Sequence, residues 1–403
     1  MKKSEFYVNA RNDLKGPLHG VTVVENTTTW AGPMAGCVLA DFGADVIKVE
    51  HPDGEVSRRV PPFVSDSGHS LANETVNRNK QSVSLDLRHP EGKRAFLRLV
   101  ASADIIIENF RPGTLHGWGV GYQDVAAVKP DIVYVSISGF GQFGPESDRV
   151  GYDPLAQNFS GWASLNGEPQ GGPMKAPTYL GDDLAGLHGA LGAMAALRHR
   201  DQTGEGQHVD VALVDSLLYQ CNGALSAAAL NLPLQRMGNQ FAFAVPANNY
   251  ACRNGHVFFG ALLESHWKLL AHHLGRDDLA DVDLLQRIQR RDELDELVRD
   301  YCAGLSTAEV IDAFNDLGLP GTRVNTFAEA AKEPHILERD MLQPTTLTDG
   351  TTIPLTGPAA KFSRTPTRVH TPAQPLGAQN EAVLATLGYT ADEIEQLKEV
   401  GAT

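Results

Sequence analysis

The feature that most constrains the fold of this chain is a strand–helix–strand unit near its N-terminus. Residues 21–25 (Val-Thr-Val-Val-Glu) predict a buried strand, and residues 31–42 predict a helix that opens on Ala-Gly-Pro. Residues 46–50 (Val-Ile-Lys-Val-Glu) predict a second strand. Because the helix carries the chain back to the starting edge, the two strands must run parallel. The unit therefore predicts a parallel sheet covered by helices.

The same alternation continues to about residue 140. Further strands are expected at 82–85, 105–108 and 132–137, with helices at 91–101 and 122–128. We therefore expect an α/β fold whose first part is a Rossmann-like, doubly wound parallel sheet. The turn after the first strand lacks the Gly-x-Gly-x-x-Gly pattern, which argues against a nicotinamide dinucleotide as ligand.

The second half of the chain predicts a smaller α/β domain. An alternating strand at 208–213 leads into a long helix at 214–230. Beyond it, one strand (257–259) and three helices are expected, at 265–274, 291–303 and 307–317. We expect two domains: a large Rossmann-like domain that begins the chain and, after a linker strand and helix at 201–230, a small domain at 231–330.

The C-terminal part is expected to contain extended chain and a final helix. Residues 340–375 are rich in proline and threonine and predict mostly extended chain. Thr390 with Glu393 three residues later predicts the capped start of a final helix.

Composition excludes several classes of function. The net charge of −15 argues against nucleic acid as a partner, and no apolar run is long enough for a membrane span. The N-terminus has no apolar segment typical of a secretory signal. The four cysteines have no spacing typical of disulfides or zinc ligands, so we expect a cytoplasmic protein without a metal site.

Two carboxylates, Asp182 and Asp183, stand at the predicted start of a helix rich in alanine and glycine. The apolar residues Leu187, Leu191 and Met194 predict its buried face. The helix dipole should lower the pKa of an aspartate in the first turn and leave an ionised carboxylate able to attack a carbonyl. An ordinary helix cap explains the same residues and is the commoner case, so the segment alone favours the cap.

A colinear set of short motifs resembles the class III CoA-transferases, the family of formyl-CoA and carnitine CoA-transferases. The 2-methylacyl-CoA racemases share its fold. The motifs span nearly the whole chain from Leu18 onward and are Ala31-Gly32-Pro33, Gly43 to Glu50, Asn79-Lys80, Asp86-Leu87, Glu108 to Gly113, Ser138 to Gly141, Gly151-Tyr152-Asp153, Gly181-Asp182, Thr203 to Gln207 and Leu387-Gly388-Tyr389.

The resemblance implies a covalent mechanism. The family's catalytic aspartate stands four residues before a glycine, which is the relation of Asp182 to Gly186, and Asp183 is the rival one position along. Such an enzyme moves CoA from a donor such as succinyl-CoA to a small carboxylic acid through a mixed anhydride and an aspartyl-CoA thioester. CoA is then a substrate, and no tightly bound cofactor is expected.

The resemblance also implies which residues contact CoA. They are Thr28, Thr29, Trp30, Ala31, His51, Lys80, Asn109, Phe110 and Arg111. Trp30 stands where relatives have a glutamine that orients the reacting groups. Arg58, Arg59, Arg78 and Arg149 are further basic candidates for CoA binding, and for most of these four a solvated surface charge is the simpler interpretation. Backbone donors for an oxyanion are expected at Gly139, Gly141, Gly238 and Asn239.

Two other functions stay open at this point. A racemase or epimerase needs a base on each side of the substrate's α-carbon, but the racemase branch has histidine where this chain has Tyr152, a poor base at neutral pH. A non-catalytic CoA-binding protein would not need Asp182. The resemblance finally implies an interlocked, ring-like homodimer, with long extended segments near 190–230 and 330–375 as linkers. The chain would then return to the first domain, so that the large CoA-binding domain is discontinuous and comprises residues 1–200 and 331–403.

Overall fold

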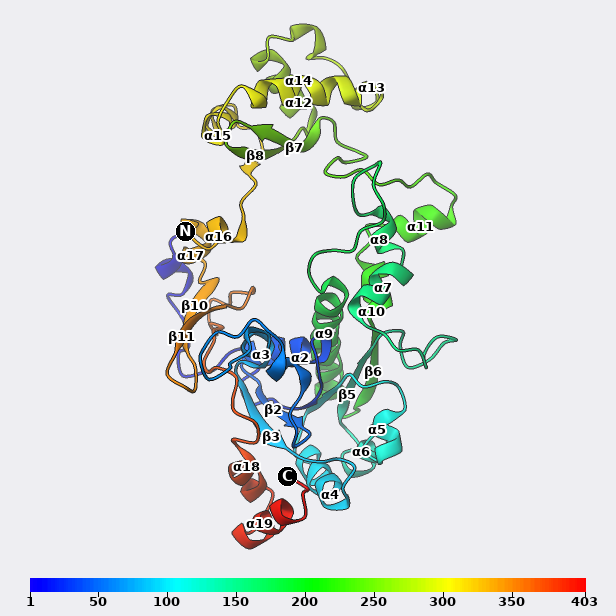
Figure 1. The fold of residues 1–403 in the computed structure, drawn as a ribbon, viewed down its shortest axis with the longest axis vertical. Coiled ribbons are helices and arrows are strands. Elements are labelled where there is room, and N and C mark those ends of the chain that lie inside the picture. The colour runs from blue at the N-terminus through cyan, green and yellow to red at the C-terminus, as the bar shows by residue number, and fades with distance from the viewer. The chain divides into compact units, whose positions relative to one another are not determined.

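The computed structural model describes residues 1–403, and its largest element is a parallel six-stranded sheet (Figure 1). The strands lie in the order β3-β2-β1-β4-β5-β6, and each neighbouring pair is parallel. This is the strand order of a doubly wound, dinucleotide-binding type of fold, so the predicted fold class is confirmed. The strands are β1 (Thr22–Asn26), β2 (Asp45–Glu50), β3 (Lys80–Ser84), β4 (Ile105–Glu108), β5 (Val133–Ser138) and β6 (Gln207–Ala212).

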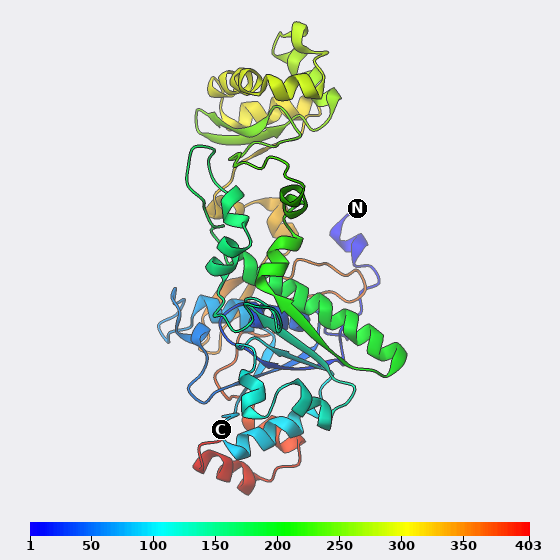
Figure 2. The same ribbon diagram turned by 90° about the vertical axis from the view of Figure 1, so that its right-hand side faces the viewer.

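Helices cover both faces of this sheet, as Figures 1 and 2 show. Because successive strand residues point to opposite faces, Ile105 and Ile107 enter one core and Ile106 the other. The first core is closed by α2 (Ala31–Asp41), α7 (Asp153–Phe159), α9 (Leu180–Thr203) and α10 (Leu213–Tyr219). The second is closed by α4 (Pro90–Val100), α5 (Thr114–Trp118), α6 (Tyr122–Val128), α18 (Asn380–Thr386) and α19 (Ala391–Glu399).

The chain forms two compact units. The first comprises Met1–Trp162, Lys175–Ser226 and Pro334–Thr403, and the second Ala163–Met174 and Ala227–Glu333. Most of the segment expected as a linker, 201–230, thus belongs to the first unit. The remaining elements of the first unit are α1 (Lys3–Phe6), η1 (Val56–Arg59), α3 (Leu71–Asn77), α17 (Pro334–Glu338) and the hairpin of β10 (Leu342–Thr346) and β11 (Thr352–Thr356).

The second unit is an antiparallel three-stranded sheet with helices packed around the buried Trp267. Its strands are β7 (Ala247–Cys252), β8 (Gly255–Gly260) and β9 (Gly321–Arg323). Its helices are α12 (Glu264–His273), η2 (Asp277–Leu279), α13 (Leu284–Gln289), α14 (Arg291–Ala303), α15 (Thr307–Asp316) and α16 (Phe327–Ala330). The short helices α8 (Trp162–Leu165) and α11 (Ala224–Ala229) contain the unit boundaries.

Several element predictions were wrong in detail. The helix expected at 214–230 breaks after Tyr219, because Asn222 and Gly223 have φ angles of +51° and +80° that a right-handed helix cannot contain. The expected extended linker near 190 is helical, since α9 continues to Thr203. The capped start of the last helix is confirmed: Thr390 accepts a hydrogen bond from the Glu393 N–H.

The buried face of α9 also differs from the predicted one. Leu187 and Leu191 are 51% and 59% exposed, whereas Leu197 and most of the alanine and glycine positions are buried. Small residues face the sheet because α2 and β5 lie too close for larger ones: a Cβ added at Gly189 would lie 2.7 Å from Ile137 Cδ1. None of the helices combines the length and hydropathy that a membrane span requires.

Candidate active site

A cavity of about 220 Å³ lies in the first unit, at the carboxyl ends of β1, β4 and β5. Ligands of open α/β sheets bind at this edge, where the strand order reverses. The cavity brings together nine of the residues singled out in the sequence, namely Thr28, Thr29, Trp30, Ala31, Asn109, Phe110, Arg111, Arg149 and Asp182. Gly139 and Tyr152 line it as well.

The turn between β1 and α2 forms one wall of this cavity. Thr28 donates its backbone N–H to Asn109 Oδ1 at 2.8 Å, and Asn109 Nδ2 returns a hydrogen bond to the Thr28 carbonyl at 2.8 Å. Thr29 has a φ of +70°, a left-handed conformation that is rare for a β-branched residue. Its N–H donates to Glu55 Oε2 at 3.0 Å, which helps to hold the turn in this conformation.

The start of α9 forms the opposite wall. Asp153 Oδ1 accepts the Gly181 backbone N–H at 2.7 Å, so a side chain from α7 satisfies one of the free donors at the helix start. Asp182 and Asp183 lie in the first turn. Close approach of α2 requires a glycine one turn later, since a Cβ at Gly186 would lie 2.9 Å from the Ala31 carbonyl oxygen.

The two adjacent carboxylates differ in their partners. Asp182 lines the cavity and accepts no hydrogen bond from the chain, whereas Asp183 accepts one from Trp30 Nε1 at 2.7 Å. Burial, Asp153 and Asp183 raise the pKa of Asp182 to about 7. The expectation of a lowered pKa was therefore wrong, because burial and two nearby carboxylates outweigh the helix dipole. Burial also raises the pKa of Asp183, against the lowering effect of the Trp30 hydrogen bond.

Comparison with known proteins decides the family. A model of CoA-transferase family III matches residues 18–380. The chain belongs to CoA-transferase family III. It is a CoA-transferase in fold and in class of activity, because its curated relatives share this function over nearly their whole length.

Three relatives and one solved structure illustrate the similarity. The beta subunit of succinyl-CoA–L-malate CoA-transferase of Chloroflexus aurantiacus is 35% identical, over 95% of this chain and 97% of that protein. Succinate–glutarate CoA-transferase of Agrobacterium fabrum is 34% identical (93% and 96%), and succinyl-CoA:mesaconate CoA-transferase of Haloarcula hispanica 35% (81% and 85%). A crystal structure of a CaiB/BaiF family protein from Brucella suis has a TM-score of 0.82 at 32% identity, covering 93% of this chain and all of that one.

Lys80 lies outside the cavity of this transferase, contrary to the interpretation as a CoA contact. Its ammonium is buried and forms an ion pair with Glu25 at 2.6 Å. It also donates to the Pro33 carbonyl at 2.8 Å and to Asn77 Oδ1 at 3.0 Å. With every donor occupied inside the protein, Lys80 holds α2 and α3 against the sheet instead of facing a ligand.

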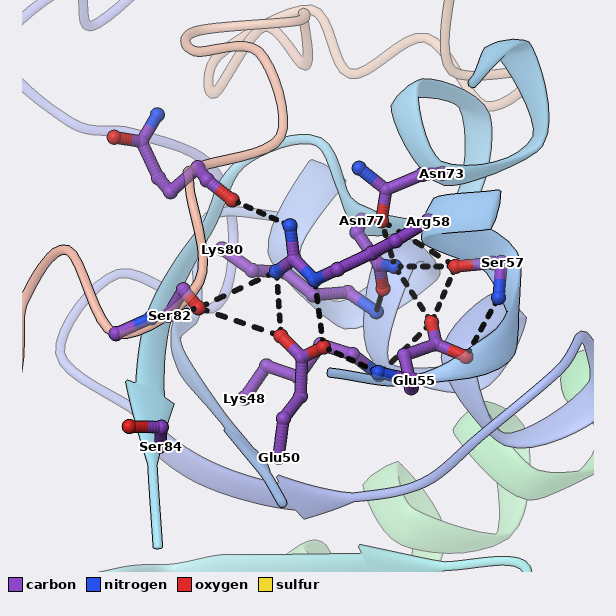
Figure 3. A network of polar contacts seen from close by, with 12 residues as sticks. Lys48, Glu50, Glu55, Ser57, Arg58, Asn73, Asn77, Lys80, Ser82 and Ser84 are labelled. Atoms are coloured by element: carbon purple, nitrogen blue, oxygen red, sulfur yellow. Dashed lines mark hydrogen bonds and ion pairs between the residues drawn. The ribbon is translucent and has the colours of Figure 1, made fainter. Parts of the chain in front are cut away.

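The other basic candidates divide into buried and exposed groups. Arg58 forms a buried pair with Glu50 and Arg78 with Asp41, so both were misjudged as solvated charges (Figure 3 draws the Arg58 contacts). Arg59 is exposed. His51 is partly exposed outside the cavity, with Arg88 and Asp86 as its neighbours.

Two of the candidate oxyanion donors, Gly139 and Gly141, belong to the first unit. Gly139 lines the cavity and lies against Gly151, where a Cβ would come within 2.5 Å of the Gly151 Cα. Gly141 has a φ of +88° and donates its N–H to Ser138 Oγ at 3.0 Å. Gly238 and Asn239 belong to the second unit.

Sequence reasoning missed the buried charges beneath the cavity. Lys48 forms ion pairs with Glu25 at 3.0 Å and with Glu55 at 3.6 Å, and Glu55 also accepts hydrogen bonds from Ser57 and Asn77 (Figure 3). Lys48 and these hydrogen bonds overcome the effect of burial and lower the pKa of Glu55 to about 2. The sequence did contain a signal for these buried charges, since charged residues stand inside otherwise apolar strands, as in Val46-Ile47-Lys48-Val49-Glu50.

Proposed function

We propose that this transferase moves CoA from succinyl-CoA to a small dicarboxylic acid, with Asp182 as the nucleophile. The single observation that carries the proposal is that Asp182 lines the cavity with a carboxylate that no group of the chain occupies. L-malate, glutarate and mesaconate, named for the relatives, are the acceptors to try first.

At each step of the proposed reaction, an acyl group remains activated, either as a thioester or as an anhydride. An Asp182 oxygen attacks the thioester carbonyl, the C–S bond breaks, and a mixed anhydride and CoA thiolate result. The thiolate attacks the Asp182 carbonyl, and succinate leaves with the shared anhydride oxygen. The acceptor carboxylate then attacks the aspartyl-CoA thioester, and the thiolate returns to the acceptor's carbonyl, which frees Asp182. No proton is gained or lost overall.

The environment of Asp182 suits this role. A carboxylate with a pKa raised to about 7 is more basic, and hence more nucleophilic, than an ordinary aspartate. Two anionic neighbours, Asp153 and Asp183, also repel the negative charge of Asp182. This repulsion is relieved once Asp182 is acylated and neutral. Thr28, Asn109 and Phe110 are the proposed contacts of CoA along the cavity wall.

Chemical trapping tests the proposal. The protein is incubated with succinyl-CoA, quenched with hydroxylamine or borohydride, and mapped by peptide mass spectrometry. We expect a modified Asp182 in the wild type and in Asp183→Asn, and none in Asp182→Asn, with CoA exchange reduced by at least about a thousandfold in Asp182→Asn. Exchange at full rate in Asp182→Asn would refute the assignment. Deuterium wash-in at the α-carbon without an acceptor would instead support a racemase.

We further propose that the enzyme works as a homodimer. Exposed apolar side chains gather on neighbouring helices of the first unit, Leu187 and Leu191 on α9 and Tyr219 on α10. The ring of Tyr219 packs edge-on against His188 at 5.3 Å, which keeps the two helices' exposed surfaces continuous. A second copy is the proposed occupant, in the interlocked arrangement that the family resemblance implies.

A further inference from the structure

Trp30 gives different hydrogen-bonding partners to two carboxylates, Asp182 and Asp183, that are adjacent in sequence. Trp30 Nε1 donates to Asp183 Oδ1 at 2.7 Å, and the Trp30 ring packs edge-on against Tyr179 at 5.2 Å. Asp182 has no such partner and faces the cavity. The indole N–H therefore binds the Asp183 carboxylate and leaves the Asp182 carboxylate available to a ligand.

Trp30 is held in place by the buried charges beneath its turn. The two hydrogen bonds between Thr28 and Asn109 fix one side of the turn. Glu55 fixes the other side, since its Oε2 accepts the Thr29 N–H at 3.0 Å. Glu55 is in turn held by Lys48 and by Asn77 Nδ2 at 3.0 Å (Figure 3). A turn fixed from both sides can present the indole in one orientation.

We propose that Trp30 is a positioning residue that binds Asp183 and thereby leaves Asp182 as the one carboxylate that meets the acyl group. The inference rests on the proposed function of Asp182. In this arrangement Trp30 keeps the equally charged Asp183 out of the reaction, and Asp183 acts as a fixed negative charge beside Asp182.

The electrostatic consequence has a definite sign. The Trp30 hydrogen bond favours the ionised form of Asp183, and an ionised Asp183 raises the pKa of Asp182. The other charged or titratable groups around the pair are Asp153 on α7, and Arg149, Tyr152 and Tyr179 in the surrounding segments. Removing the indole N–H lets Asp183 hold its proton more readily, so the pKa of Asp182 falls.

A double-mutant cycle tests this coupling. The pH dependence of kcat/KM for CoA exchange is measured for the wild type, Trp30→Phe, Asp183→Asn and the double variant. The acid limb reports ionisation of the nucleophile, because activity rises as Asp182 loses its proton. We expect Trp30→Phe to move this limb to lower pH by about half a pH unit. In the Asp183→Asn background the same substitution should move it no further, because residue 183 then carries no charge.

A merely structural role for Trp30 would give a different result. The acid limb would then stay in place, or would move equally in both backgrounds, and either result would overturn the inference. Trp267→Phe, which removes a buried indole hydrogen bond to Leu279 in the second unit, controls for lost stability. Activity in Asp182→Asn would instead refute the proposed function, so the two failures can be distinguished.

Discussion

At the scale of single residues, the raised pKa of Asp182 links activity to stability. The folded protein holds the Asp182 proton to about pH 7, whereas an unfolded chain releases it near the ordinary value of 3.8. Folding stability from this group is therefore fully present below about pH 4 and declines as the pH rises toward 7. A charged Asp182 is the form that the proposed attack requires, and it is also the form that destabilises the fold.

Asp182→Asn should accordingly make the protein more stable at alkaline pH. We expect a free energy of unfolding roughly 1 to 3 kcal/mol above that of the wild type at pH 8. The gain should shrink as the pH falls toward 5, where the wild-type carboxyl is protonated in the folded state. Urea titrations at both pH values measure the difference. An identical difference at pH 5 and pH 8 would contradict the assigned pKa.

Arg149 is expected to recognise the second carboxylate of the acceptor. Its guanidinium lines the cavity and lies over the rings of Phe140 and Phe159, at 5.4 and 5.7 Å from their centroids. Its anionic partner is Glu146 at 3.1 Å, whose side chain is 43% exposed and can be exchanged for a ligand carboxylate. A cation is needed here because Asp182 would otherwise repel a doubly charged acid.

Arg149→Ala should raise the KM for a dicarboxylate acceptor by about tenfold to a hundredfold. The KM for a monocarboxylate of similar length should change little, since it offers no second charge. Steady-state kinetics with glutarate and butyrate measure both, and Arg59→Ala supplies a control at an exposed arginine outside the cavity. Equal effects on the two acids would show that Arg149 does not read the second carboxylate.

Sequence could indicate residues that lie together but not their surroundings. It predicts roles in CoA binding or catalysis for Trp30, Asn109 and Asp182, and the structure brings these three residues to one cavity. The direction of the Asp182 pKa shift could not be predicted, because it depends first on burial and then on Asp153, which lies on another helix. Lys80 was misassigned for the same reason: its partner Glu25 is on another strand, and a single sequence gives no distance between them.

At the scale of elements, α2 packs closely against the first turns of α9 beside the cavity. At Gly186, an added Cβ would be 2.9 Å from both the Ala31 carbonyl oxygen and Met34 Cβ. Ala31 also lines the cavity. A change at Gly186 should therefore affect both the helix packing and the site.

Gly186→Ala tests this contact. Alanine favours a helix over glycine by about 1 kcal/mol, but the clash with a backbone carbonyl forces a shift that costs about 1 to 3 kcal/mol. We expect a net loss of stability and reduced CoA exchange. Gly117→Ala in α5, where a Cβ meets nothing within 4 Å, should be neutral or slightly stabilising. Thermal unfolding of both variants measures the change in stability. A Gly186→Ala variant that is more stable than the wild type would contradict close packing of α2 against α9.

Element types were predictable where the apolar pattern was strong. Strand β4 and helix α6 have the expected bounds, because continuous apolar runs and regular spacing are local signals. The buried face of α9 was not predictable, since small residues are buried only where a partner comes close. The break after Tyr219 depends on Asn222 and Gly223, two residues that a helical pattern tolerates until their φ angles are known.

At the scale of the whole molecule, the exposed leucines of α9 bear on assembly. Scattered apolar residues are normal on a protein surface, but Leu187, Leu191 and Tyr219 lie on packed neighbouring helices. α9 also carries Asp182 in its first turn. Association through this surface would therefore stabilise the helix that holds the proposed nucleophile.

The double variant Leu187→Glu, Leu191→Glu should disrupt the proposed dimer. Charges at these positions resist burial against a second copy, so analytical ultracentrifugation should show a shift from about 87 kDa to the 43.4 kDa of one chain. Val128→Glu, on the exposed part of α6, is the matched control and should stay dimeric. A wild type that sediments as a single chain would refute the dimer. A double variant that stays dimeric would place the interface elsewhere. A wild type that assembles only with a different chain would indicate a heteromer. The names of the Chloroflexus relatives describe alpha and beta subunits for that enzyme.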